Sequence, residues 1–377
     1  MNYRGVLVRS LLCALLTLAI GSSGPVSAAS AASQSAAIAA IKAELERQAN
    51  ADQFSGAVLI ERGGATLLES AYGFADRERL LRNTAQTRFR FGSMGKMFTA
   101  VAVMQLVQAG KVQLDDPLGK FLPDYPNQEV AKVTIEQLLT HTGGTGDIFG
   151  PEFAEHRASL KELSDYVALY GRRGTQFAPG TRHEYSNYGF VLLGRVIEVV
   201  SGKPYHDYLT RYVFGPAHMN SSGNLPEHPA IANLAVGYTH GPMHGPGQAA
   251  DAPLRSAEEF LPYRGTSAGG GYSTADDLLR FANALAAHRL VNAALTETMT
   301  TGHVDTPRPE LKYAFGFEAE TLANGVRRIG HGGGAPGMNG ILWIFPQSQT
   351  VVIVLANLDP PAAQGIARFI IDQLPLQ

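Results

Sequence analysis

Residues 91–110 read FGSMGKMFTAVAVMQLVQAG, and this stretch predicts a buried helix at the centre of the protein. Between Ser93 and Ala109 the residues are rich in helix formers, and after Lys96 they are almost wholly apolar. Gly110 and Lys111 supply a stop signal for this helix. Because a helix that is apolar on every side has no face suited to water, the other elements are expected to pack around it.

The start of this helix carries a Ser-x-x-Lys pattern, from Ser93 to Lys96. Positions three apart share one face of a helix, so the hydroxyl and the amine can meet. A Ser hydroxyl needs an adjacent base to act as a nucleophile, and Lys can be that base only if burial or a neighbouring cation lowers its pKa. The apolar helix provides such burial, and its N-terminus would add backbone donors for an oxyanion. Alone, the pattern is weak and would favour a helix-capping Ser93 beside a solvated Lys96.

Strand-like segments lie toward both ends of the chain, and the middle is helical and rich in loops. These segments predict one sheet built from both termini, with an inserted helical lobe. The boundaries are 36–113 with 265–377 for the discontinuous sheet domain and 114–264 for the mainly helical lobe. The predicted strands are 56–60 and 66–72 as a hairpin, 89–91, 313–318, 327–330, and 341–345 paired with 350–355; a closing helix carries Ile366, Phe369 and Ile370 on one face.

The first 28 residues predict a secretory signal peptide. Arg4 and Arg9 give a positive start, Leu11 to Ile20 is apolar, and Val26-Ser27-Ala28 has the small residues of a cleavage site. The alternative is an uncleaved membrane anchor, but a bilayer span needs about 20 apolar residues. We therefore expect an exported protein, periplasmic or secreted, with no stable membrane span after cleavage.

Composition excludes several classes of protein. The 377 residues are 45% hydrophobic and 17% charged, which is too apolar for a disordered chain. The only Cys, Cys13, lies inside the signal, so neither a disulfide framework nor a thiolate metal site is expected. With a net charge of −2, the chain lacks the excess of basic residues that is typical of nucleic-acid-binding proteins. After the signal, residues 29–35 are a small-residue linker.

Two later motifs give the Ser93-x-x-Lys96 pattern its meaning. Tyr185-x-Asn187 precedes a predicted helix, and His331-x-Gly333 follows the predicted strand 327–330. In this order the three resemble the motifs of the penicillin-recognising serine hydrolases, in the branch of class C β-lactamases, D-alanyl-D-alanine carboxypeptidases and family VIII esterases. The resemblance runs from about residue 36 to the C-terminus. It implies an α/β plus all-α, β-lactamase/transpeptidase-like fold, with helices on both faces of an antiparallel sheet.

The resemblance also implies a role for each matching residue. Ser93 would attack the substrate carbonyl, Lys96 would take its proton, and Tyr185 would relay a proton to the leaving group. Asn187 would hold Lys96 and a substrate amide, while His331 and Gly333 would contact the substrate. The backbone N–H groups of Ser93 and Gly334 would form the oxyanion hole. No cofactor and no metal are expected.

His331 departs from many relatives, which carry Lys at this position. A neutral imidazole attracts a carboxylate less than an ammonium does, and with a reference pKa of about 6.5 any attraction should fade as the pH rises. We therefore expect a D-Ala-D-Ala carboxypeptidase-like enzyme or D-amino-acid peptidase acting on a peptidoglycan peptide or another small molecule. The alternatives are a short-chain carboxylesterase, then a β-lactamase or a non-catalytic binding protein. The sequence does not give the oligomeric state.

Three other patterns could suggest different chemistry. Gly265-Thr-Ser267-Ala-Gly269 matches the nucleophile elbow of α/β-hydrolases, but no apolar strand precedes it, so Ser267 is expected to be a turn residue near the site. His240 and His244 have metal-ligand spacing, but the intervening Gly241-Pro242 forbids the helix that this spacing needs. His141 is expected to be structural. Residues 141–155 and 235–265 are expected to shape the substrate pocket.

Overall fold

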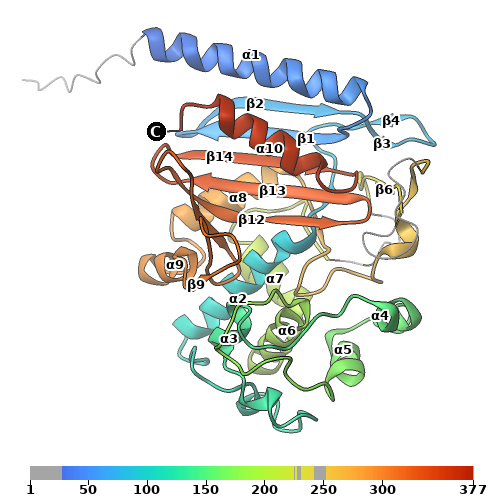
Figure 1. Cartoon of the computed structure of the whole chain (residues 1–377), viewed down its shortest axis with the longest axis vertical. Helices are drawn as coiled ribbons and strands as arrows, with labels where there is room; N and C mark the ends of the chain where they lie inside the picture. The colour runs from blue at the N-terminus through green and yellow to red at the C-terminus, as the bar shows by residue number, and fades with distance from the viewer. Residues whose placement is uncertain (1–27, 225, 227–230, 242–251, 377) are drawn as a thin grey trace, which may run out of the picture.

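The computed structural model describes residues 28–224, 226, 231–241 and 252–376 (Figure 1). The predicted signal peptide, apart from Ala28, and His244 lie outside these residues. Within the described part, every helix is too short or too polar to cross a bilayer.

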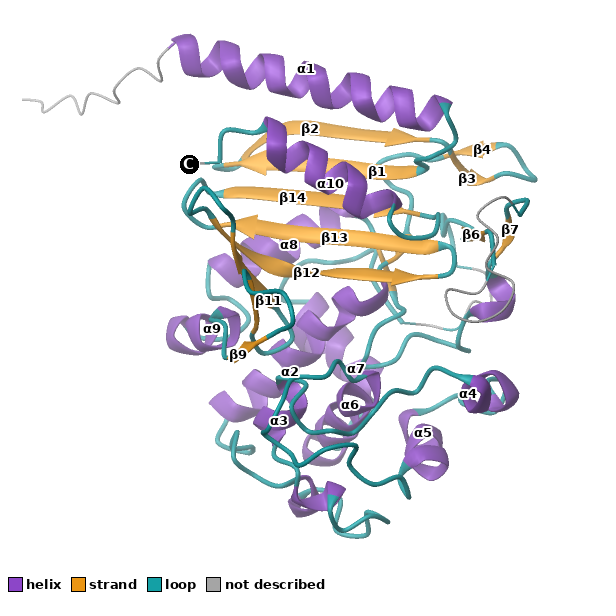
Figure 2. Cartoon of the chain, in the orientation of Figure 1, coloured by secondary structure: helices purple, strands orange, loops and turns teal. Residues whose placement is uncertain are grey.

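An eight-stranded antiparallel sheet forms the upper half of the molecule (Figure 2). Its strand order is β2-β1-β14-β13-β12-β11-β10-β9, so the first hairpin of the chain pairs with the last long strand, as the sequence predicts. The strands are β1 Gly56–Arg62, β2 Ala65–Tyr72, β9 Val304–Asp305, β10 Leu311–Tyr313, β11 Glu318–Thr321, β12 Arg327–Ala335, β13 Met338–Phe345 and β14 Thr350–Ala356. Short strands pair outside it: β3 Phe74–Asp76 with β4 Leu81–Arg82, β5 Phe89–Arg90 with β8 Tyr272–Ser273, and β6 Tyr238–Thr239 with β7 Arg255–Ser256.

Helices cover both faces of the sheet, which confirms the predicted architecture. On one face, α1 (Ala28–Asn50) and α10 (Ala362–Gln373) bury Ile41 and Ile366 against strand residues such as Val352. On the other face, α8 (Ala275–Ala286) contacts β1 and β14. Because the centre of the sheet is covered on both sides, β13 and β14 are buried along their whole length and their sequences are almost continuously apolar.

The helix predicted at the centre, α2 (Gly95–Gln108), lies between the sheet and the helical lobe. Its residues from Gly95 to Met104 are all buried. The ring of Phe98 contacts the edges of Phe91, Phe214 and Phe281, which come from three separate parts of the chain. The remaining helices are α3 Ile135–Leu139, α4 Pro151–His156, α5 Leu163–Tyr170, α6 Asn187–Ser201, α7 Tyr205–Leu209 and α9 Ala293–Thr300. Helix α2 packs against α6, α7 and α9.

The structure differs from the sequence-based expectation in three places. Strand β12 does not stop at Gly330 but continues through the glycine run, because Gly333 and Gly334 pair with β13. The predicted strand 313–318 is two strands, since Gly316 (φ +68°) turns the chain between β10 and β11. Residues 29–35 belong to α1 instead of a linker, in keeping with the helix propensity of their alanines.

Candidate active site

Ser93 lies in a tight turn between β5 and α2, where the glycine run of β12 passes close by. A Cβ atom on Gly333 would lie 2.0 Å from the carbonyl oxygen of Phe91, and one on Gly92 would lie 3.0 Å from the backbone nitrogen of Gly334. Strand β11 pairs with β12 only as far as Gly330. The following residues of β12 therefore face the Ser93 turn, and the missing side chains allow this approach.

Lys96 is fully buried one turn after Ser93 and contacts three polar partners. Its Nζ atom lies 2.7 Å from Asn187 Oδ1, 2.7 Å from the carbonyl oxygen of Ala268 and 3.3 Å from Ser93 Oγ. Burial lowers the pKa of Lys96 to about 7. A neutral amine has two N–H donors and one lone pair, so donation to the two oxygens leaves the lone pair for the Ser93 hydroxyl.

Asn187 is held in place by the start of α6. Ser186 caps this helix, since its Oγ accepts from the Gly189 N–H at 2.9 Å. The Asn187 amide donates from Nδ2 to Asp147, at 2.9 Å from Oδ2, and this fixes which end of the amide faces Lys96. Asp147 also opposes the lowering of the Lys96 pKa through its charge. No sequence motif pointed to Asp147.

Tyr185 lies beside Lys96 at the mouth of the site. Its ring centre is 4.6 Å from Lys96 Nζ, and 37% of its surface is exposed. Desolvation raises the pKa of the phenol, while a hydrogen bond with Ser93 acts in the opposite sense. Tyr185 is therefore a neutral phenol at physiological pH, able to donate its proton.

His331 is neutral, and this corrects the expectation that its charge changes near pH 6.5. Burial, with a smaller contribution from Lys96, lowers its pKa to about 3. Its Nδ1 contacts the carbonyl oxygen of Gly332, so this atom carries the proton and Nε2 accepts from the Tyr313 hydroxyl at 3.0 Å. Tyr313 was not identified from the sequence. The pair presents no positive charge to a substrate carboxylate.

His141 supports the loop that carries Tyr185. Its Nδ1 accepts from the Ser186 N–H at 3.1 Å, its carbonyl oxygen accepts from the Glu184 N–H at 2.9 Å, and its ring centre is 4.3 Å from that of Tyr185. It lies just beyond the end of α3 and has a positive φ of +58°. Desolvation lowers its pKa well below the ordinary value, so its role is that of a neutral acceptor and not of a cation at a helix end.

Ser267 forms no second site, and of the His240–His244 pattern the structure describes only His240. Ser267 is completely buried behind the Ser93 turn, and its Oγ has no hydrogen-bond partner among the described residues. His240 donates its backbone N–H to Asp359. Across the described ranges, no group of three or more His, Cys, Asp or Glu side chains could hold a metal ion.

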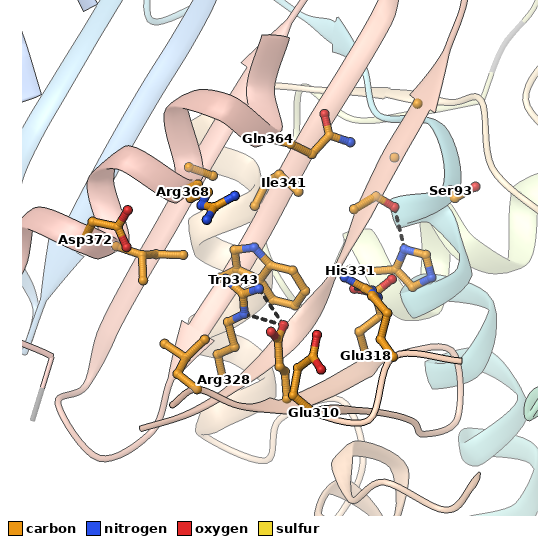
Figure 3. Close-up of a pocket in the computed structure, with 18 of the residues that line it drawn as sticks. Ser93, Glu310, Glu318, Arg328, His331, Ile341, Trp343, Gln364, Arg368 and Asp372 are labelled. Carbon is orange, nitrogen blue, oxygen red and sulfur yellow. Dashed lines mark hydrogen bonds and ion pairs between the residues drawn. The ribbon is translucent and has the colours of Figure 1, made fainter. Parts of the chain in front are cut away.

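A cavity of about 720 Å³ opens from Ser93 and Tyr185 along β12 toward α10 (Figure 3). Its walls come from β11, β12, β13, the loop before β10, and α10, with His331 and Gly332–Gly334 beside Ser93. The described residues of 141–155 and 235–265, which were expected to shape the pocket, do not line it. The difference arises because β12 passes beside the Ser93 turn and brings its neighbouring strands to the cavity, which sequence spacing does not reveal.

Known proteins are similar to this chain in sequence and in fold. A family model described as Beta-lactamase matches residues 42–374. Penicillin-binding protein 4* of Bacillus subtilis (strain 168) is 29% identical over 315 residues, covering 81% of this chain and 68% of that protein. The structure of a penicillin-binding protein from Bacillus halodurans has a TM-score of 0.78 at 30% identity and covers 89% of this chain and 100% of that chain. A D-stereospecific amidohydrolase from Streptomyces sp. has a TM-score of 0.72 at 28% identity, covering 91% of this chain and 97% of that chain.

Proposed function

The chain belongs to the beta-lactamase family and is a serine hydrolase, and we propose that it cleaves the amide or ester bond of D-aminoacyl substrates through an acyl-enzyme on Ser93. The observation that carries this proposal is the environment of Lys96. Two acceptors at 2.7 Å take both N–H bonds of the neutral amine and leave its lone pair for Ser93 Oγ.

In the first step, Ser93 Oγ bonds to the substrate carbonyl carbon and its proton passes to Lys96 Nζ. The resulting oxyanion accepts from the backbone N–H groups of Ser93 and Gly334, and losing one such donor typically lowers the rate about 10²–10³-fold. The bond to the leaving group then breaks, and the leaving group takes a proton through the Tyr185 phenol, which Lys96 reprotonates. A water molecule reverses these proton transfers to release the acid and restore Ser93.

The neutral His331–Tyr313 pair bears on the substrate class. A carboxypeptidase substrate has a free carboxylate next to the scissile bond, and nothing on this pair attracts that charge. A D-aminoacyl amide or ester lacks the carboxylate, and hydrolysis of such a substrate is compatible with the structural similarity to a D-stereospecific amidohydrolase. Among the activities that the sequence suggests, D-amino-acid peptidase or amidase activity is therefore favoured over carboxypeptidase activity. We also propose that residues 1–28 direct export.

The proposal is tested with a panel of acyl donors: D-alanine p-nitroanilide, its L-isomer, D-Ala-D-Ala, p-nitrophenyl acetate and benzylpenicillin. We expect D-alanine p-nitroanilide to be cleaved faster than the L-isomer and than D-Ala-D-Ala, with no turnover by Ser93→Ala. Intact-mass spectrometry should detect an acyl adduct that Ser93→Ala lacks. Turnover of p-nitrophenyl acetate alone would identify an esterase, and rapid benzylpenicillin hydrolysis a β-lactamase; either result would refute the D-aminoacyl assignment.

A further inference from the structure

Two glutamates of β11 differ in how their charges are balanced. Glu318 and Glu320 are two residues apart, so their side chains lie on the same side of the strand. Opposite Glu320 on β12 stands Arg328, whose Nε donates to the Glu320 carboxylate at 2.9 Å and whose Nη2 makes a second bond. Opposite Glu318 stands Gly330, which has no side chain. The cross-strand position therefore supplies a cation to Glu320 but none to Glu318.

The other neighbours of Glu318 supply one loosely held cation, Arg308, and the charge of Arg328, which is bonded to Glu320. Tyr313, opposite it on β10, is neutral because desolvation raises its pKa far above the ordinary value. The nearest guanidinium nitrogen, Arg308 Nη2, is 3.6 Å away, beyond hydrogen-bond distance, and the Arg308 side chain is 56% exposed. No hydrogen bond reaches the Glu318 carboxylate from the described residues. The side chain is nevertheless only 20% exposed, and burial raises its pKa.

Glu318 lines the same cavity as Ser93 and Tyr185. In Figure 3 it lies next to His331, between Ser93 and Arg328. Because His331 is neutral, the wall between Ser93 and Arg328 presents a carboxylate whose ion pair among the described residues is the 3.6 Å contact to the exposed Arg308. A partly desolvated carboxylate in such a position gains from a cationic ligand that can donate hydrogen bonds to it.

We propose that Glu318 binds a primary ammonium group of the substrate, so that the enzyme prefers acyl donors that carry an ammonium to neutral ones of the same shape. An ammonium is compact and has three donors, so it can enter the cavity and replace the long contact to Arg308. This inference rests on the proposed function and adds to it the chemical class of the substrate. It also assigns a specificity role to a residue outside the three motifs.

The test measures equilibrium binding by calorimetry in a Ser93→Ala background, where no turnover occurs. The probes are two pairs of amides in which a methyl group replaces the ammonium: D-alaninamide with isobutyramide, and Nα-acetyl-D-lysinamide with Nα-acetyl-D-2-aminoheptanamide. We expect the ammonium member of at least one pair to bind about tenfold tighter or more. Adding Glu318→Gln should abolish that preference.

Two further variants sharpen the result. Glu310→Gln removes the same charge from an exposed part of the same cavity and should keep the preference, which separates a specific contact from the general field of the cavity. Arg308→Gln removes the competing guanidinium from an exposed position and should tighten binding of the ammonium ligand. Because Arg308 is exposed, this second variant keeps the inference testable if Glu318→Gln does not fold.

Equal affinities within both pairs, or a preference that survives Glu318→Gln, would overturn the inference. Ser93-dependent turnover of the acyl-donor panel is a separate measurement. If turnover occurs without an ammonium preference, the inference fails and the proposed function stands. If Ser93-dependent turnover is absent, the proposed function itself fails, whatever the binding data show.

Discussion

Ser93 and Ser267 both lie in turns rich in small residues, and both match a nucleophile pattern of serine hydrolases. The two turns touch, since a Cβ atom on Gly269 would lie 2.2 Å from the carbonyl oxygen of Gly92. Ser93 nevertheless borders a cavity and has Lys96 Nζ at 3.3 Å, whereas Ser267 Oγ is buried against α6 and has no partner among the described residues. Access and an adjacent base, more than the local sequence, therefore distinguish a nucleophile from a packing residue.

The largest effect is expected when Ser93 is changed to Ala. Removal of the attacking oxygen should lower kcat by about 10⁴-fold or more. Stability should change little, because the Ser93 side chain caps neither its own turn nor α2. Steady-state kinetics and a thermal melt measure the two effects. Residual activity within tenfold of the parent would mean that Ser93 is not the nucleophile, and Ser267 would again be a candidate.

The pH dependence of kcat/KM tests whether Lys96 is the base that activates Ser93. Lys96 must be deprotonated to accept the Ser93 proton, and burial lowers its pKa to about 7. Activity should therefore fall about tenfold per pH unit below pH 7 and level off above it. His331 does not titrate in this range, because its pKa is about 3. A profile from pH 5 to 9 with no change near pH 7 would argue against Lys96 as the base.

Asn187→Ala removes one of the two oxygens that orient Lys96. The amine would then lose its fixed direction toward Ser93, and Asp147 would lose a hydrogen-bond donor. We expect kcat/KM to fall about 10²-fold, a typical contribution of a positioned proton-transfer group. The matched control is Asn283→Ala in α8, which removes an amide that bonds to Glu61. Equal losses in the two variants would show a general effect of the substitution.

The smallest effect is expected for Ser267→Ala. The removed hydroxyl is buried with no hydrogen-bond partner in the described part of the chain, so its loss should leave the stability equal or slightly higher, and kcat/KM within about twofold. Thermal melts and kinetics on the substrate used for Ser93→Ala give the comparison. An inactive but folded Ser267→Ala protein would instead favour the α/β-hydrolase interpretation.

The sequence predicted more of the fold than of the cavity. The apolar periodicity of the terminal strands and of residues 93–109 indicated the sheet and the central helix, because side-chain burial follows from local pattern. The extent of β12 was missed, since glycines have weak strand propensity and Gly333 is strand only because it pairs with β13 and passes the Ser93 turn. Asp147 and Tyr313 stand in no recognised motif, and only the folded chain brings them beside Asn187 and His331.

By itself, the sequence determined the identity and order of the three motifs and the apolar helix that buries Lys96. Those features are encoded locally, in residue type and in the spacing along one helix. The tertiary structure alone decided that Ser267 is inaccessible, that His331 is neutral, and that Glu318 faces the cavity with a long contact to Arg308 in place of a hydrogen-bonded cation. Each of these depends on desolvation and on neighbours from distant segments. No short stretch of sequence therefore determines the accessibility of a side chain or its free energy of ionisation.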